Sequence, residues 1–278
     1  MGVNGHGPDR DEEENEPMAE LTYGSYLKID ELLSLQQPQS DPVEHDELLF
    51  IVIHQIYELW FKEVLHELDE LVEYLNEDRP ALSGHQLKRV LKILKTLVAQ
   101  LDVLETMTPL EFGSFRAFLA RSSGFQSAQF RELEFLLGLK DPAHLARFSH
   151  NPRERDNLTR RYHDPSIWDA FLAYLARQGY AVPAEVLGRD VTAPVAASDG
   201  VQQVLLAIYR EDAELARLCE SFTDLDEGFQ EWRYRHVMMV HRTIGTKPGT
   251  GGSDGVTYLR STLFHPAFPD LWAVRSLF

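Results

Sequence analysis

Residues 232–259 read WRYRHVMMVHRTIGTKPGTGGSDGVTYL, and the rest of the chain is interpreted around this stretch. Its first half is predicted to be a helix, because Trp232, His236 and Met239 recur at the three- and four-residue spacing of one helical face. Its second half holds five of the chain's 17 glycines, which can take positive φ and allow a ligand to approach the backbone closely. The stretch therefore places a histidine on an apolar helical face, shortly before a glycine-rich loop.

Two interpretations of His236 stay open from these residues alone. It is either a hydrogen-bonded histidine of the core, with the glycines as a surface hinge, or an axial ligand of a metal or haem over which the loop folds. The loop is not a Walker phosphate cradle, because no Gly-Lys-Ser/Thr ends it.

The composition describes an ordinary globular protein, with 278 residues of which 44% are hydrophobic and 26% charged. A formal charge of −17 argues against nucleic acid and anionic membrane surfaces as partners. The longest apolar run, residues 48–53, is far shorter than the roughly 20 residues of a membrane span. The single cysteine, Cys219, excludes an internal disulfide and Cys-rich metal sites. The N-terminus lacks the apolar core of a secretory signal, so a cytoplasmic location is expected.

The chain is predicted to begin with a disordered acidic tail, residues 1–18, followed by a single all-α domain over residues 19–278. Thr22 is a candidate cap for a short helix over residues 22–36. Such a helix is marginal alone and must dock, either on its own core or on a neighbouring subunit.

Longer helices are expected next, over residues 41–77 with Asp41-Pro42 as the start signal, and over residues 84–106. Thr108-Pro109 opens another helix that ends at the loop 122–124. Residues 140–197 are broken by prolines and are a candidate small helical subdomain, with a helix over 165–177. A helix over 198–221 leads into the stretch that begins at Trp232. No convincing period-2 pattern appears, so the fold is predicted to be a multi-helix all-α bundle.

Two further side chains carry possible chemistry. His54 shares a helical face with Phe50, Tyr57 and Phe61, so it is either a buried structural histidine or the polar group of an apolar pocket. Arg116 lies among aromatic residues, where a desolvated guanidinium needs a carboxylate, from a salt bridge or from a ligand.

Other metal and hydrolase chemistries are not supported by the spacing of the residues. A di-iron carboxylate bundle needs Glu-x-x-His on two helices, and only Glu63 and His66 fit. His-x-x-x-His is absent, as is the Gly-x-Ser-x-Gly nucleophile elbow. A helical pocket with two histidines is left, in which one histidine can hold a haem and the other can face the ligand.

Several segments together resemble the tryptophan 2,3-dioxygenase family: LTYGSYL (21–27), FIVIHQIYELWFKE (50–63), FRAFLARSSGFQS (115–127), WRYRHVMMVHRTIGTKPGTGG (232–252) and YLRSTLFHPAFPDLW (258–272). The resemblance covers the chain from about residue 20 to 278. It implies an all-α homotetramer with haem b, whose iron binds O2. It also implies that both oxygen atoms are inserted across the indole C2–C3 bond of L-tryptophan. The product would be N-formyl-L-kynurenine, in the first step of the kynurenine pathway.

The resemblance also implies roles for individual residues. His236 matches the proximal iron ligand and His54 the catalytic histidine that contacts the indole N–H. Arg116 matches the group that binds the substrate carboxylate, and Thr250 the residue near its ammonium group. The remaining matches are walls of the indole pocket (Phe50 and Phe112), residues lining the haem (Ser123, also near substrate, and Gly124), and residues inserted into a neighbour's active site (Tyr23, Tyr26 and Leu27).

Three positions depart from the family pattern. His241 stands where relatives carry an acidic or amide side chain, Phe112 where some carry tyrosine, and Asp254 where a small residue is common. These differences put the fine tuning of the site in doubt and leave the expected reaction unchanged. The alternative from another class is a haem-based sensor without turnover.

Overall fold

The computed structural model describes residues 1–2, 21–120, 122–148, 150–250 and 255–278, which form helices and loops with no strand. The all-α prediction is therefore confirmed for the described part of the chain. Two units are distinguished, Met1–Gln37 and Pro38–Phe278. The predicted disordered tail falls almost wholly outside the described residues.

The first unit contains α1 (Tyr23–Leu27) and α2 (Ile29–Leu33). The α-helices of the second unit are α3 (His45–Asn76), α4 (Pro80–Leu104), α5 (Pro109–Phe115), α6 (Ala128–Leu136), α7 (Pro152–His163), α8 (Ile167–Arg177), α9 (Ala184–Leu187), α10 (Asp199–Glu211), α11 (Ala213–Ile244), α12 (Val256–Ser261) and α13 (Pro269–Ala273). Its 3₁₀ helices are η1 (Arg116–Leu119), η2 (Gly124–Gln126), η3 (Pro142–Phe148) and η4 (Val274–Leu277).

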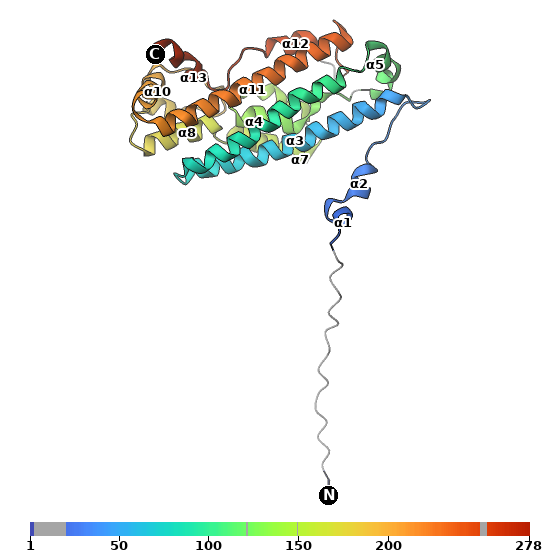
Figure 1. Ribbon diagram of the computed structural model, residues 1–278, viewed down its shortest axis with the longest axis horizontal. Helices are drawn as coiled ribbons and strands as arrows, with labels where there is room; N and C mark the ends of the chain where they lie inside the picture. Colours follow the sequence, from blue (N-terminus) through green and yellow to red (C-terminus); the bar gives the residue numbers. More distant parts are fainter. Residues whose placement is uncertain (3–20, 121, 149, 251–254) are drawn as a thin grey trace. The chain divides into compact units, whose positions relative to one another are not determined.

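The second unit is organised around the long helices α3, α4 and α11, and α4 packs against both of the others (Figure 1). Leucines at three- and four-residue spacing supply the contact faces, such as Leu68, Leu71 and Leu75 of α3, which are fully buried. A Cβ at Gly228 of α11 would lie 3.2 Å from Leu94 Cδ1 of α4, so glycine allows a close approach there. These helices form the rigid frame on which the candidate site is built.

The N-terminal unit has two short helices where the sequence predicted one over residues 22–36. Thr22 caps α1 as predicted, in a reciprocal capping box with Ser25. Lys28 then takes a left-handed conformation (φ 53°), which ends α1 before α2 begins. Within this unit the side chains of Tyr23 and Tyr26 are 77% and 72% exposed, so neither packs into a hydrophobic core there.

Several predicted helix boundaries are wrong, and side-chain caps explain two of them. Asp212 interrupts the predicted 198–221 helix, because its carboxylate accepts from the Glu214 and Leu215 N–H groups and begins α11 there. Helix α4 begins at Pro80, four residues earlier than predicted, with the proline in its first turn. Helix α8 begins after a capping box at Ser166 instead of at 164–165.

The predicted helix start at Asp41-Pro42 is also wrong, since α3 begins at His45. The segment before it is instead fastened to the buried carboxylate of Glu47. That carboxylate accepts from the Gln39 N–H (2.8 Å), the Ser40 N–H (2.9 Å) and the Ser40 hydroxyl (2.5 Å). These bonds occupy the place that a proline-initiated first turn would have taken.

We expect Glu47→Gln to destabilise the fold by about 1–3 kcal/mol at neutral pH, because a charged acceptor of three hydrogen bonds is lost. Burial raises the pKa of Glu47, but the bonds from Ser40 and Gln39 outweigh it and hold that pKa below its ordinary value. A lowered folded-state pKa stabilises above the unfolded-state value, and the effect disappears as the pH falls through the folded-state value. Urea unfolding should therefore separate wild type and variant at pH 7, and the difference should shrink as the pH falls through the folded-state pKa of Glu47. Asp46→Asn removes the same charge from the same helical turn and should change little.

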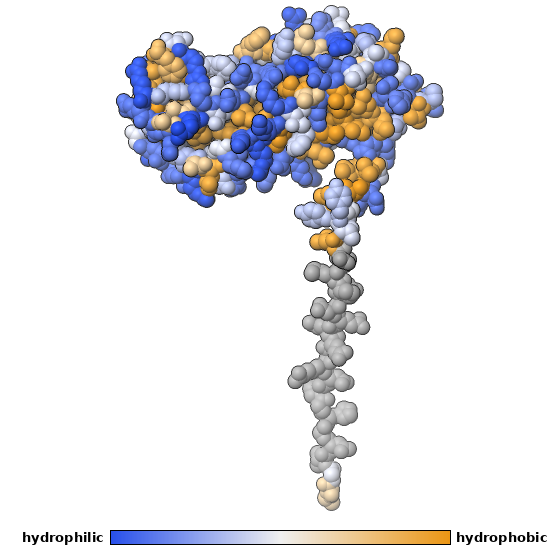
Figure 2. Space-filling view, viewed as in Figure 1, coloured by the Kyte–Doolittle hydropathy of each residue, from blue (hydrophilic) through white to orange (hydrophobic). Residues whose placement is uncertain are grey.

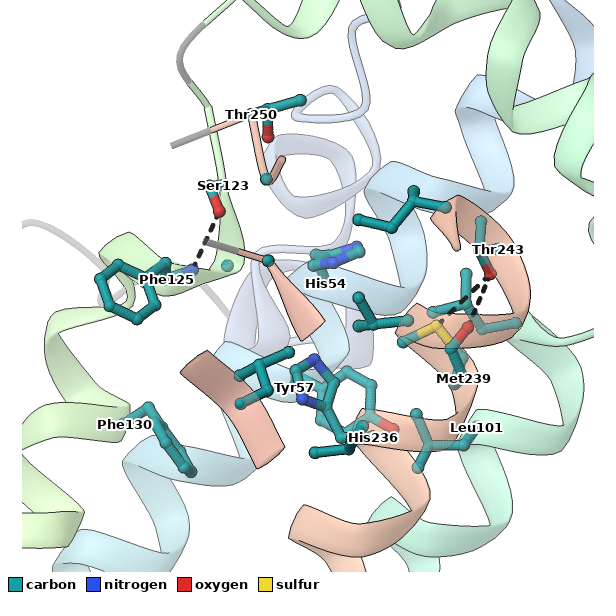
Figure 3. A pocket seen from close by; sticks show the side chains of 18 of the residues that line it. His54, Tyr57, Leu101, Ser123, Phe125, Phe130, His236, Met239, Thr243 and Thr250 are labelled. Carbon is teal, nitrogen blue, oxygen red and sulfur yellow. Dashed lines mark hydrogen bonds between the residues drawn. The ribbon is translucent and has the colours of Figure 1, made fainter. Parts of the chain in front are cut away.

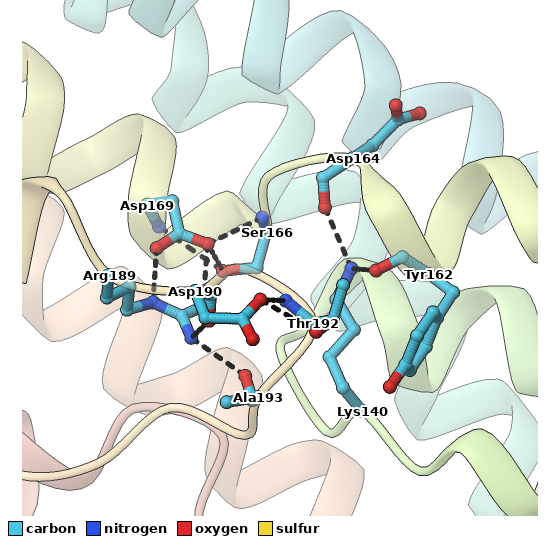
Figure 4. A network of polar contacts seen from close by, with 9 residues as sticks. All are labelled: Lys140, Tyr162, Asp164, Ser166, Asp169, Arg189, Asp190, Thr192 and Ala193. Atoms are coloured by element: carbon cyan, nitrogen blue, oxygen red, sulfur yellow. Dashed lines mark hydrogen bonds and ion pairs between the residues drawn. The ribbon is translucent and has the colours of Figure 1, made fainter.

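A polar network joins the loop after α6 to the end of α7, and the segment after α9 to α8 (Figure 4). Lys140 donates to the carbonyls of Arg161 (2.5 Å), Tyr162 (3.0 Å) and Asp164 (2.8 Å), at the end of α7. Burial lowers the pKa of Lys140 to about 8. Beyond α7, Arg189 pairs with both oxygens of Asp169 on α8, at 2.7 and 2.8 Å. The network fixes the loop that follows α6, and α6 contributes to the candidate site.

Candidate functional site

One cavity brings together most of the predicted site residues (Figure 3). It is lined by α3, α4, α5, α6, α11, α12 and the loops beside them, and its empty space is about 1560 Å³, part of it open to solvent. Apolar and aromatic side chains dominate the wall, and a few polar groups interrupt it. A large apolar cavity with few polar groups is the usual form of a cofactor or small-molecule site.

His236 extends from α11 into this cavity (Figure 3). Its ring stacks on the indole of Trp232 one turn earlier, with centroids 5.2 Å apart and planes inclined by 5°. Burial, aided by His54 and Arg131, lowers the pKa of His236 to about 4, so the ring is neutral at physiological pH. The ring has no hydrogen bond to any described residue. A neutral imidazole with an unengaged nitrogen is the form that binds a metal.

His54 lies on α3 and lines the same cavity. Its Nδ1 is 2.7 Å from the Phe50 carbonyl, which can only accept, so Nδ1 carries the proton. Burial lowers the pKa of His54 and favours the neutral ring, although the Phe50 carbonyl and Glu58 act in the opposite direction. In this tautomer Nε2 is an acceptor, available to an N–H donor in the cavity.

Aromatic rings form the wall beside His54. The Phe50 centroid lies 4.1 Å from that of His54, 5.7 Å from Phe112 and 5.6 Å from Phe115. Phe112 and Phe115 meet edge to face at 5.4 Å. This corner offers a flat ligand apolar contacts on several sides and one polar partner.

Arg116 and Thr250 also line the cavity, and each is bonded to a main-chain oxygen. Arg116 Nη2 donates to the Pro248 carbonyl at 2.6 Å, and the Thr250 hydroxyl donates to the Ser122 carbonyl at 2.6 Å. Since these bonds join segments about 130 residues apart in the chain, they hold the loop after α11 against the loop after η1. A cation and a hydroxyl are thus placed at the same part of the wall.

The turn at Ser123 and Gly124 completes this side of the cavity. Ser123 caps η2, its hydroxyl accepting from the Phe125 N–H at 3.3 Å. Gly255 also lines the cavity; it has φ +58°, and a Cβ there would lie 2.7 Å from the Lys247 carbonyl. Only glycine therefore fits at the start of α12. Residues 251–254, which include Asp254, lie outside the described residues.

The N-terminal residues predicted to reach a neighbour's site belong to the unit Met1–Gln37. Tyr23, Tyr26 and Leu27 form α1, and all three side chains are exposed within it. His241 is exposed on α11 and does not line the cavity.

Sequence reasoning missed a cluster of buried charges in the cavity wall, made by Arg131 and Glu134 of α6 and Arg233 of α11. The ring of Tyr258, which meets Phe125 edge to face at 4.8 Å, was missed as well. The signal in the sequence is weak: FRELEF (130–135) mixes charged and apolar residues without any sign that its charges face inward.

Among the described residues, no group of three His, Cys, Asp or Glu side chains is placed to hold a metal ion by itself. The cavity instead presents one neutral histidine without a partner and a second histidine on another helix. An all-α protein with this arrangement is of the class whose iron is carried by a haem, with a small organic molecule held beside it.

Known proteins agree with this class. Residues 9–162 and 196–278 match the family described as tryptophan 2,3-dioxygenase. The tryptophan 2,3-dioxygenase of Herpetosiphon aurantiacus is 59% identical over 256 residues, which cover 92% of this chain and 98% of that protein. Those of Anaeromyxobacter sp. and Bordetella parapertussis are 58% and 46% identical, covering 92% of this chain and 96% and 91% of their own lengths. The chain belongs to the tryptophan 2,3-dioxygenase family.

Proposed function

We propose that this chain converts L-tryptophan and O2 to N-formyl-L-kynurenine with a haem bound in the cavity. Family membership makes the chain a haem-dependent dioxygenase of tryptophan. The observation that supports the assignment of its residues is that His236 and His54, 182 positions apart in the numbering, line one apolar cavity together with Arg116 and Thr250.

The donor groups of the cavity fit a haem. His236 is neutral and without a hydrogen-bond partner among the described residues, so its imidazole is the group to hold the iron. Ser123 and Gly124 lie on the wall that would accompany the porphyrin. When bound, the haem supplies the iron that binds and activates O2.

His54 and the aromatic wall are suited to the indole ring. Because Nδ1 of His54 is committed to the Phe50 carbonyl, Nε2 is the acceptor for the indole N–H. Phe50 and Phe112 enclose the ring without competing for that hydrogen bond. The corner therefore orients the indole by one polar contact and two apolar faces.

Arg116 and Thr250 are suited to the amino-acid end of the substrate. The guanidinium of Arg116 is the cation for the carboxylate, and the Thr250 hydroxyl is an acceptor for the ammonium group. Both oxygen atoms of O2 end in the product, so the reaction consumes no external reductant. The remaining task of the protein is to exclude water, which the loop carrying Thr250 performs from its place on the cavity wall.

Two measurements test this proposal: an absorption spectrum of the protein with haem, and then an assay of L-tryptophan turnover. Protein reconstituted with haem should show a Soret band that shifts on addition of L-tryptophan. The ferrous protein should form N-formylkynurenine in the presence of O2. A haem-based sensor would bind haem and gas without forming product, so steady-state turnover separates the two functions. Failure to take up haem would refute both.

We expect His54→Ala to retain haem and lose about tenfold in kcat/KM, since one hydrogen bond that orients the indole is removed. If His54 were an obligatory base, the loss would be about 10²–10⁴-fold. Steady-state kinetics with L-tryptophan distinguish these roles. His66→Ala, an exposed histidine on the same helix, is the control and should behave as wild type.

We propose further that the chain forms a homotetramer in which residues 21–27 of one subunit complete a neighbour's cavity. This is supported by the exposed aromatic side chains Tyr23 and Tyr26 on a helix of only five residues, which cannot be stable alone. Among the described residues no helix is long and apolar enough to cross a bilayer. A cytoplasmic location stays a prediction.

Deletion of residues 1–30 should raise KM for L-tryptophan by about tenfold or more, because the neighbour's cavity loses the aromatic contacts of this segment. Deletion of residues 1–18 alone should leave KM unchanged, because it removes the acidic tail and spares Tyr23, Tyr26 and Leu27. Light scattering of both truncations reports the oligomeric state. Equal KM values for the two truncations would contradict the exchange of this segment.

A further inference from the structure

Three buried charged side chains in the cavity wall form an ionic cluster with more positive than negative charge. Glu134 pairs through one oxygen with Arg131 and through the other with Arg233. Arg131, Glu134 and Arg233 are only 4%, 4% and 7% exposed. Two cations therefore share a single carboxylate, in a place from which water is largely withheld.

The neighbouring carboxylates do not cancel the surplus positive charge. Glu132 points to Arg161 of α7, 3.6 Å away, and Arg161 also pairs with Asp69. Glu58 lines the cavity, but its oxygen accepts from Gln129 Nε2 at 2.8 Å, and no arginine of the described part of the chain pairs with it. A buried net charge is costly unless an opposite charge meets it, so the cluster is built for an anion.

Of the two arginines, Arg131 is the one with donors to spare. Arg233 donates to the Thr262 carbonyl at 3.0 Å in addition to its bond with Glu134. Arg131 bonds only to Glu134, and its buried Nε has no partner among the described residues. Its guanidinium carbon lies 4.9 Å from the Phe125 centroid and 5.2 Å from that of Phe130, and both rings line the cavity.

We propose that Arg131, held in position by Glu134, binds a carboxylate side chain of the haem. The inference rests on the proposed haem site, and it names the group that neutralises the cluster. The amino-acid carboxylate is the other possible source of the same chemistry, but it is assigned to Arg116, which lies beside the loop carrying Thr250 through its bond to the Pro248 carbonyl. Arg131 contributes to lowering the pKa of His236, which places the two side chains within electrostatic reach of each other.

The test compares ferric haem with its dimethyl ester, in which both carboxylates are blocked. Haem transfer from the full-length protein to an excess of apomyoglobin gives the dissociation rate of each form. Arg131→Gln should release haem about ten- to a hundredfold faster than wild type, because a charge-assisted contact is lost. It should release the ester at the wild-type rate.

Arg161→Gln is the matched control, since it also breaks a buried ion pair, next to the cluster but outside the cavity wall. It should release haem and ester as wild type does. Arg131→Met, an apolar chain of similar reach, replaces the glutamine variant if that variant does not fold, and must show the same preference.

If Arg131→Gln released haem and ester faster by the same factor, Arg131 would act only through packing. If it released neither faster, Arg131 would have no contact with the cofactor. Each result overturns the inference. Unchanged haem release with a large rise in the tryptophan dissociation constant would assign Arg131 to the substrate and overturn it too. Wild-type protein that binds no haem would instead refute the proposed function.

Discussion

His236→Ala should abolish both the Soret band and the conversion of L-tryptophan. The variant removes the only imidazole on α11 that lines the cavity, and Met239, one turn later on the same wall, offers a thioether and no imidazole nitrogen. The neighbouring wall is apolar, so the haem would keep only its apolar and carboxylate contacts. Haem titration followed at the Soret maximum measures the loss, and product formation should fall below detection.

His241→Ala is the control for this variant. His241 lies on the same helix, is exposed and does not line the cavity, so its removal should leave haem uptake and turnover unchanged. If His236→Ala took up haem with wild-type stoichiometry and a wild-type spectrum, the iron would be held by another residue. The assignment of α11 as the iron-binding helix would then be wrong.

Arg116→Ala should raise KM for L-tryptophan by about 10- to 150-fold while kcat falls less, because the carboxylate loses a charge-assisted contact of about 1.5–3 kcal/mol. The haem spectrum without substrate should not change, since Arg116 acts on the ligand. Tryptamine, which lacks the carboxylate, gives the sharper measurement. Its binding to wild type and variant should be the same, within the accuracy of a spectral titration.

Arg242→Ala is the corresponding control, because Arg242 forms an exposed ion pair with Glu105 at 3.3 Å and does not line the cavity. It should leave KM unchanged. If Arg116→Ala weakened tryptophan and tryptamine equally, the arginine would be positioning the loop through the Pro248 carbonyl instead of binding the substrate.

The parts of the site that could be predicted from sequence lie on long, uninterrupted helices. His54 and His236 each fall on an apolar face with a clear 3.6-residue period, and that pattern alone predicts that they point inward. Their meeting in one cavity depends on how α3 and α11 pack around α4, which no local pattern encodes. Only the resemblance to the family predicts that the two histidines share one cavity.

The ionic cluster shows what local patterns cannot predict. Arg131 and Glu134 lie three residues apart in α6, which reads as an ordinary surface pair on a helix. Its burial becomes visible only when Arg233, about 100 residues later, is brought to the same carboxylate. Helix boundaries fail for a related reason, since Asp212 resembles a helical surface residue until its carboxylate is seen to cap α11.

The bonds that Arg116 and Thr250 make to backbone oxygens have a consequence for affinity. They hold both side chains in place without using up the groups that a ligand needs, because Thr250 donates its proton to Ser122 and keeps its lone pairs, and Arg116 uses one of its N–H donors on Pro248 and keeps the others. Less side-chain entropy is then lost when the substrate binds. Replacing Pro248 by residues that move its carbonyl should therefore weaken tryptophan binding, even though the substrate loses no contact.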